Sequence, residues 1–356
     1  MDNSRPLSRR DVLRLMTVGA GATALAACGS VSTTETVSLP ETAPPSPTAT
    51  LEPTATSLPP METPVPAPTV PSGPELATRF AHISDMHIEK EGPSREHFSR
   101  AMRNVQQLNP PVEFVVNAGD CVMDALFSNK EDAITQWDRF SSVLNADFPL
   151  PVYHAIGNHD VWGWGLSEEK QAAVQDDPLF AKGMAMERLG LAERYYAFEQ
   201  GGWHFIVLDS IHLADQVFEH PYTGKLDDEQ YDWLVNQLET TPAETPICIV
   251  SHIPLFGASG LMDSSEKSGN WVMPGAWQHI DGRRFIDLFW QHRNVKLCLS
   301  GHTHQVEDLN YHGAHYLTNG AISGNWWKGA FHDFPPGYVV FNLYKDGSFE
   351  SEFIAY

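Results

Sequence analysis

Five short segments carry side chains that could do chemistry, and each follows a run of apolar residues. The segments are, in order, Asp85-Met86-His87, Gly119-Asp120, Gly157-Asn158-His159-Asp160, Ser251-His252 and Gly301-His302-Thr303-His304. Short apolar runs bounded by glycine are typical of buried strands. Reacting groups in α/β proteins gather at the carboxyl ends of such strands. We therefore expect these side chains to meet at one site.

The residue types indicate a metal centre. The candidate ligands are Asp85, His87, Asp120, Asn158, His252, His302 and His304. They supply carboxylate, imidazole and amide groups but no thiolate, which disfavours a structural zinc site. They are too many for one ion and suit two ions that share a bridging carboxylate. Each motif alone also has a structural explanation, because a Gly-Asn pair, for example, is common in tight turns.

Alternating strand and helix patterns would position these motifs. Strands are predicted at 79–84, 112–116, 151–156, 195–198, 203–209, 246–250, 295–300, 305–310, 314–318, 337–343 and 348–354. Helical spacing is predicted at 94–108, 132–144, 226–238 and 283–291, with a loop and helix inserted in 161–194. This alternation predicts an α/β domain. Within it, His82, Cys121, Cys248 and Cys298 are expected to be structural. Asp124 is expected either to support the centre, which we favour, or to lie exposed on a helix.

The amino-terminal residues have the layout of an export signal. Paired Arg9 and Arg10 precede an uncharged apolar run, 15–27, which is too short to span a bilayer and matches a twin-arginine signal peptide. The run ends in Leu-Ala-Ala-Cys28, which resembles a bacterial lipobox and predicts cleavage before Cys28 and lipidation of its sulfur. An ordinary cleavage site is the alternative. The expected location is extracytoplasmic, on the bacterial cell membrane, with the twin-arginine export machinery and the membrane as partners.

The segment that follows cannot build a core. All 18 Phe, 10 Trp and 10 Tyr residues lie at or after Phe80, and the preceding residues are rich in Pro and Thr. Such composition favours an extended, disordered chain. We therefore assign residues 1–27 to the signal peptide, 28–78 to the lipidated cysteine and linker, and 79–356 to the folded domain that carries the five motifs.

Net charge restricts the partners. The chain of 356 residues carries a net charge of −22. A strongly acidic surface is a poor partner for a nucleic-acid duplex. If the substrate is itself an anion, a local positive charge such as a bound metal must make the electrostatic potential at the binding site positive. Four cysteines are too few for a disulfide framework. Oligomeric state stays open.

Taken together, the five motifs resemble the calcineurin-like metallophosphoesterase family over residues 79–356, with class III cyclic-nucleotide phosphodiesterases as the nearest subgroup. The resemblance implies a four-layer αββα sandwich of two mixed β-sheets flanked by helices. It implies that the first metal is held by Asp85, His87, Asp120 and His304, and that the second is held by Asp120, Asn158, His252 and His302. The ions would be Mn, Fe or Zn. The resemblance also implies that His159 protonates the leaving group and that Asp160 supports its loop.

The same resemblance implies hydrolysis of a small phosphoester by a metal-bridging hydroxide, with His159 as general acid. Two divalent ions, two aspartates and one hydroxide leave about one positive charge, which matches a phosphodiester better than a phosphomonoester. A trivalent ion would weaken this preference. The alternative is a surface-tethered protein that binds a phosphate ligand and uses the metals only for structure, although such a protein has no need of His159. A metallo-β-lactamase-like hydrolase would need a clustered His-x-His-x-Asp-His stretch, which is absent.

Tryptophans in the predicted loops could shape the pocket. Six of the ten follow ligand motifs: Trp162, Trp164, Trp271, Trp277, Trp326 and Trp327. They could line the rim and stack on a base or sugar, or they could pack the insertions. Lys328 is the nearest basic residue in a predicted site loop.

Overall fold

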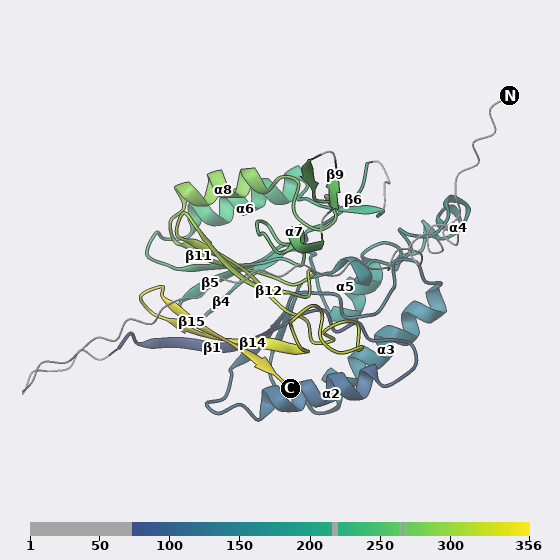
Figure 1. The fold of residues 1–356 in the computed structure, drawn as a ribbon, viewed down its shortest axis with the longest axis horizontal. Coiled ribbons are helices and arrows are strands. Elements are labelled where there is room, and N and C mark those ends of the chain that lie inside the picture. The colour runs from purple at the N-terminus through teal and green to yellow at the C-terminus, as the bar shows by residue number, and fades with distance from the viewer. Residues whose placement is uncertain (1–72, 216–219, 264, 268) are drawn as a thin grey trace, which may run out of the picture. The chain divides into compact units, whose positions relative to one another are not determined.

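Two mixed β-sheets form the centre of the fold (Figure 1). The computed structural model describes residues 73–215, 220–263, 265–267 and 269–356. The predicted signal peptide, Cys28 and nearly all of the predicted linker lie outside these residues. Within the described residues, no helix has the length and apolar character needed to cross a bilayer.

The five-stranded sheet has the order β15-β14-β1-β2-β3. Its strands are β1 (Leu76–Ile83), β2 (Phe114–Asn117), β3 (Val152–His154), β14 (Gly337–Tyr344) and β15 (Phe349–Ala355). Strands β1, β2 and β3 run parallel, whereas β14 pairs antiparallel with β1 and β15. The carboxyl ends of the three parallel strands therefore lie at one edge of the sheet.

The six-stranded sheet has the order β12-β13-β11-β8-β5-β4. Its strands are β4 (Tyr196–Gln200), β5 (Trp203–Val207), β8 (Ile247–Val250), β11 (Val295–Ser300), β12 (Val306–Tyr311) and β13 (Ala314–Asn319). The inner strands β5, β8, β11 and β13 are parallel, and β4 and β12 form antiparallel edges. Ligand motifs follow β8 and β11, so this sheet also presents predicted ligands at its carboxyl edge.

Helices cover the outer faces of both sheets. Helices α2 (Ser94–Gln106) and α3 (Lys130–Asp147) lie on the side of the five-stranded sheet, and α6 (Asp228–Thr240) and α8 (Gly282–Gln291) lie on the side of the six-stranded sheet (Figure 1). The predicted four-layer sandwich is thus confirmed. The insertion after β3 contains the short 3-10 helix η1 (Asn158–Asp160) and the helices α4 (Glu168–Val174) and α5 (Gly183–Leu189).

Strand alternation sorts the apolar side chains into three layers, because successive strand residues point to opposite faces. Phe80 and Phe114 pack between the sheets, whereas their neighbours Ala81 and Val115 pack toward α2 and α3. In β5, Ile206 belongs to the cluster beneath α6 and α8. The predicted structural cysteines Cys121, Cys248 and Cys298 are all buried.

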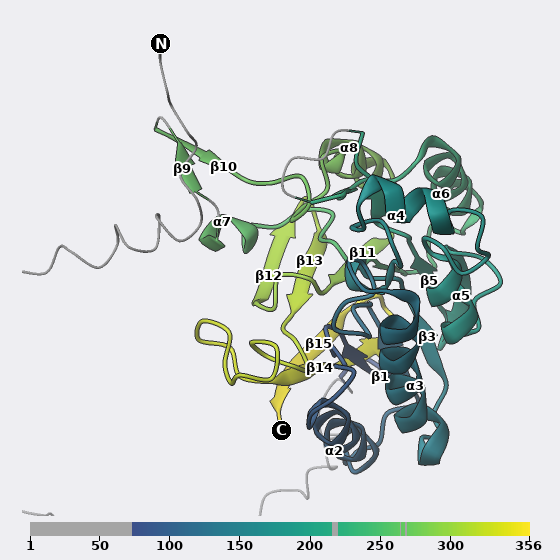
Figure 2. The ribbon, with the colours of Figure 1, turned by 90° about the vertical axis from the view of Figure 1, so that its right-hand side faces the viewer.

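Two small hairpins and a short helix were not predicted. These elements are β6 (Ile211–Leu213), β7 (Tyr222–Gly224), α7 (Gly260–Asp263), β9 (Ser265–Lys267) and β10 (Asn270–Val272). Figure 2 shows the β9–β10 hairpin standing away from the two sheets. Strand segments of three residues are too short to give a periodic sequence signal. Strand β1 also begins at Leu76, earlier than the predicted start at Arg79.

Candidate metal centre

Backbone hydrogen bonds continue beyond the strand ends and bring the motifs together. In the five-stranded sheet, the loop after β1 runs beside the loop after β2, because Asp85 N–H donates to Gly119 O at 3.0 Å and His87 N–H donates to Asp120 O at 3.0 Å. In the other sheet, Gly301 N–H donates to His252 O at 3.1 Å. Each pair of neighbouring strands thus delivers its motifs side by side.

Loops approach each other closely where the motifs carry glycine, both between the two sheets, at Gly301, and within the five-stranded sheet, at Gly157. A Cβ atom on Gly301 would lie 1.8 Å from Ser84 Oγ and 2.5 Å from Asp85 Oδ2, so only glycine permits this approach. A Cβ on Gly157 would lie 2.2 Å from the backbone nitrogen of Asp120. The amide of His302, next to Gly301, donates to Asp85 Oδ2 at 2.9 Å. The glycines of the motifs therefore set the spacing of the predicted ligands.

Several predicted ligands have a left-handed backbone conformation. The φ angles are 58° for Asp85, 45° for His87, 53° for Asp120, 69° for His302 and 57° for His304. Each such residue costs about 1–3 kcal/mol and persists only where the surrounding contacts enforce it. Strained residues of this kind concentrate at functional sites. Five of the predicted ligands thus have the strained conformation, and the described residues outside the motifs that share it include Trp326 and Trp327.

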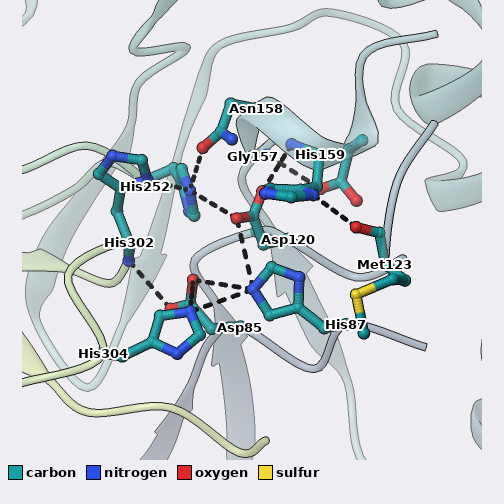
Figure 3. A network of polar contacts seen from close by, with 12 residues as sticks. Asp85, His87, Asp120, Met123, Gly157, Asn158, His159, His252, His302 and His304 are labelled. Carbon is teal, nitrogen blue, oxygen red and sulfur yellow. Dashed lines mark hydrogen bonds and ion pairs between the residues drawn. The ribbon is translucent and has the colours of Figure 1, made fainter. Parts of the chain in front are cut away.

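Asp85, His87 and His304 form the first half of the centre (Figure 3). The Nε2 atoms of His87 and His304 lie 3.1 Å apart, and Asp85 Oδ1 lies 3.4 Å from His304 Nε2 and 3.8 Å from His87 Nε2. All three residues are buried. Asp85 Oδ1 accepts no hydrogen bond from the residues that the structure describes. A buried carboxylate oxygen without a donor, facing two imidazole nitrogens, fits a cation.

The second half of the centre surrounds His252. Its Nε2 lies 3.2 Å from Asp120 Oδ2, 3.0 Å from Asn158 Oδ1 and 3.1 Å from His302 Nδ1. Its Nδ1 lies 2.8 Å from Ala118 O, and a carbonyl can only accept, so Nδ1 carries the proton of the neutral ring. The lone pair of Nε2 then faces two oxygen atoms. That arrangement is favourable only with a cation or a second proton between them.

Asp120 lies between the two halves. Its Oδ2 atom is 3.7 Å from His87 Nε2 and 3.2 Å from His252 Nε2, while its Oδ1 accepts the His159 amide at 2.8 Å. The amide fixes the carboxylate and leaves Oδ2 directed toward both halves (Figure 3). The donor set thus fits metal binding, with Asp120 available to both halves of the centre.

Burial and the aspartates set the charge of these groups. Burial lowers the pKa of His87 to about 4 and that of His302 to about 3, so both rings are neutral at neutral pH and can act as ligands. Burial also lowers the pKa of His252, but Asp120, together with Asp85 and the Ala118 carbonyl, outweighs this effect and raises the pKa to about 9. Without a metal, His252 therefore holds a second proton, which a metal ion must displace.

His159 and Asp160 lie beside the predicted ligands. The His159 ring packs edge-on against His87 with 4.7 Å between ring centres, and its Nδ1 contacts the carbonyl of Met123. Asp160 is buried and ties two loops together. Its Oδ1 accepts the Cys121 amide at 2.8 Å, and its Oδ2 accepts the Gly157 amide at 2.9 Å.

A family match covers all five motifs. Residues 78–306 match the family described as calcineurin-like phosphoesterase. The chain belongs to this family.

Individual relatives agree with the family match. A 3',5'-cyclic-nucleotide phosphodiesterase of Nostoc sp. is 25% identical over 289 residues, which cover 78% of this chain and 92% of the relative. The 3',5'-cyclic adenosine monophosphate phosphodiesterase CpdA of Escherichia coli is 23% identical, with 80% of this chain and 92% of the relative covered. A dimetal phosphatase structure from Danio rerio superposes with a TM-score of 0.54 at 15% identity, covering 79% of this chain and all of that one, and supports the fold.

The centre of this calcineurin-like phosphoesterase lies in a cavity of about 430 Å³. Besides predicted site residues, its lining consists of His220, Tyr222, Gly260, Trp277, Thr303, Trp326 and Phe331. Tyr222 lies on the β7 strand of an unpredicted hairpin, and Phe331 had no distinguishing signal in the sequence. Tertiary contacts alone bring these residues to the site.

The structure decides between alternatives that the sequence of this calcineurin-like phosphoesterase left open. Of the six tryptophans in the predicted loops, only Trp277 and Trp326 line the cavity. Trp162 is 1% exposed within the core, and Trp271 is 63% exposed on β10. Asp124, expected to support the centre, instead accepts the Phe127 amide at 2.9 Å in a local turn. Lys328 is exposed and does not line the cavity.

Proposed function

We propose that this calcineurin-like phosphoesterase hydrolyses a small phosphodiester with two metal ions. The observation that carries the proposal is the pair of half-sites sharing Asp120 in the wall of one cavity. Asp85, His87, Asp120 and His304 would hold one ion, and Asp120, Asn158, His252 and His302 would hold the other. When bound, the two cations would supply an activated water and polarise the phosphoryl group.

The protein's own groups would orient the substrate and move the proton. His159 lines the cavity, and its Nδ1–H is held by the carbonyl of Met123, which leaves Nε2 as the atom that exchanges the catalytic proton. In its protonated form, Nε2 would donate to the departing oxygen. Asp160 would keep η1 in place through the amides of Gly157 and Cys121.

Charge in the cavity favours a diester. No lysine or arginine belongs to its described lining, so a second negative charge on the substrate would meet no side-chain cation. The Nostoc and Escherichia coli relatives are named as phosphodiesterases, which agrees with this preference. The proposed substrate is therefore a small phosphodiester, with phosphomonoesters as poorer substrates.

Turnover of two chromogenic esters tests this proposal. With added Mn²⁺, we expect kcat/KM for bis-p-nitrophenyl phosphate to exceed that for p-nitrophenyl phosphate by about tenfold, which corresponds to about 1.4 kcal/mol. A chelator should abolish both activities. A higher value for the monoester would contradict the diester preference. No turnover of either ester would instead favour the non-catalytic alternative, a tethered protein that binds a phosphate ligand.

We further propose that the enzyme is exported folded and tethered by lipid at Cys28. The support is the sequence, in which Arg9-Arg10, the apolar run and Cys28 stand in the order of a twin-arginine lipoprotein signal. Because this pathway carries folded proteins, metal would be loaded before export.

Replacing Arg9-Arg10 with Lys-Lys should keep the enzyme inside the cell, as measured by fractionation and immunoblotting. A second variant, Cys28→Ser, should be exported but leave the membrane fraction, because it lacks the sulfur that carries the lipid. Normal export of metal-loaded protein with Lys-Lys would refute the twin-arginine route. Membrane retention of the serine variant would refute the anchor.

A further inference from the structure

The loop that follows β13 closes over the first half of the proposed centre. The amide of Ile322 donates to Ser84 O at 2.9 Å, and the amide of Ser323 donates to Asp85 O at 3.1 Å. The carbonyl of Gly324 contacts His304 Nδ1. This loop carries none of the predicted ligands, yet its backbone contacts two of the three residues that form the first half-site.

Two consecutive tryptophans in this loop have left-handed backbones. The φ angle is 45° at Trp326 and 67° at Trp327. Bulky residues rarely adopt this conformation and keep it only where surrounding contacts enforce it. The two rings have different surroundings. Trp326 lines the cavity with its ring 4.4 Å from that of His304, whereas Trp327 donates its Nε1–H to the carbonyl of His87 at 2.9 Å.

His87 depends on its backbone for orientation. Metal-binding histidines usually fix their rings through the nitrogen that does not bind the ion. His252 and His304 have such a contact, with the carbonyls of Ala118 and Gly324. In His87 the corresponding atom, Nδ1, is buried and has no hydrogen-bond partner among the described residues. Its backbone, in contrast, is held on both sides, by Asp120 O at the amide and by the Trp327 indole at the carbonyl.

We propose that Trp327 is a positioning residue that fixes His87 for the first metal ion. The indole bond holds the strained φ of His87 and thereby the direction of its ring, a task that ring hydrogen bonds perform for His252 and His304. This inference rests on the proposed dinuclear centre. It adds a residue that touches neither substrate nor metal.

Replacement of Trp327 by Phe tests the proposal, because it keeps an aromatic ring and removes the N–H donor. Mn²⁺ is titrated into metal-free protein and followed by calorimetry and by electron paramagnetic resonance. We expect the affinity for one of the two ions to fall about 10–100-fold, the usual effect of losing an outer partner of a ligand, while the other ion binds as before. The resonance signal of the coupled ion pair should weaken accordingly.

Trp203→Phe is the matched control. Trp203 is buried and also donates its indole N–H to a backbone carbonyl, that of Tyr344, at 3.0 Å, but it lies on β5 between the sheets. Its removal should lower the unfolding temperature and leave both Mn²⁺ affinities unchanged.

The outcomes separate the two proposals. Unchanged Mn²⁺ affinities in Trp327→Phe, or an equal loss of affinity for both ions, would overturn the positioning role. Binding of two ions by the wild-type protein would still support the proposed centre in that case. Wild-type protein that binds fewer than two ions would overturn both. Circular dichroism of the metal-free variants establishes that they are folded. Should the Phe variant be unfolded, Trp327→Tyr carries the same expectation.

Discussion

Asp120→Asn is expected to weaken both metal ions at once. The carboxylate oxygen Oδ2 faces His87 in one half-site and His252 in the other, so its charge serves both. We expect each Mn²⁺ affinity to fall by more than about 100-fold, beyond the range for outer partners of ligands. Turnover should fall with it. Calorimetry and metal content after dialysis measure the first effect, and hydrolysis of the diester measures the second.

A carboxylate in the same loop provides the control for Asp120. Asp124→Asn removes a negative charge four residues after Asp120. The described contact of the Asp124 side chain is with the Phe127 amide. This variant should keep both ions and its turnover. If Asp120→Asn lost one ion and held the other with native affinity, Asp120 would belong to one half-site, and the proposed sharing would be wrong.

Asp120→Asn should also change the protonation state of the neighbouring His252. Asp120 is the main cause that raises the pKa of His252 against the effect of burial. Without that carboxylate, burial should dominate and His252 should become neutral near neutral pH. Metal loss in the variant would then reflect a missing ligand rather than competition from the His252 proton. Titration of the His252 ring by nuclear magnetic resonance in metal-free protein follows this change.

His159→Ala is expected to lower turnover by about 10²–10⁴-fold, the usual contribution of a general acid, and to leave both metal ions bound. The reason is that the ring lines the cavity with Nδ1 held by Met123 O, while the predicted ligands come from other residues. The loss should be greatest for a diester with an alkoxide leaving group and smaller for p-nitrophenolate, which departs without a proton. Steady-state kinetics with both substrates measures the difference.

Metal content decides between two roles for His159. Its ligand atom lies within 4.8 Å of those of His87 and Asp120, so distance alone would permit it to bind an ion. Loss of one ion from His159→Ala would show that it is a ligand and contradict the proton-donor assignment. His315→Ala is a suitable control, because this histidine pairs with Asp308 on the β12–β13 edge of the sheet and should affect neither quantity.

Much of the fold could be predicted because its signals are local. Alternating residues such as Phe80 and Ala81 identify a strand within a few positions, and they occupy different layers in the structure. The three-residue strands that form the β6–β7 and β9–β10 hairpins gave no such signal. The spacing of the tryptophans along the sequence also did not predict whether each side chain lies in the core or in the cavity wall. Trp162 and Trp326 both follow ligand motifs, but one is in the core and the other lines the cavity.

The sequence by itself determined which side chains gather at the centre. A polar residue directly after a parallel strand lies at the sheet edge regardless of what surrounds it, so Asp85, Asp120 and His252 could be named from their positions alone. Only the tertiary structure decided which oxygen of Asp120 faces both half-sites, and that the Trp327 indole holds the carbonyl of His87. These contacts join residues as far as 240 positions apart, and no local pattern encodes them. They depend on how the loops of two sheets pack against each other.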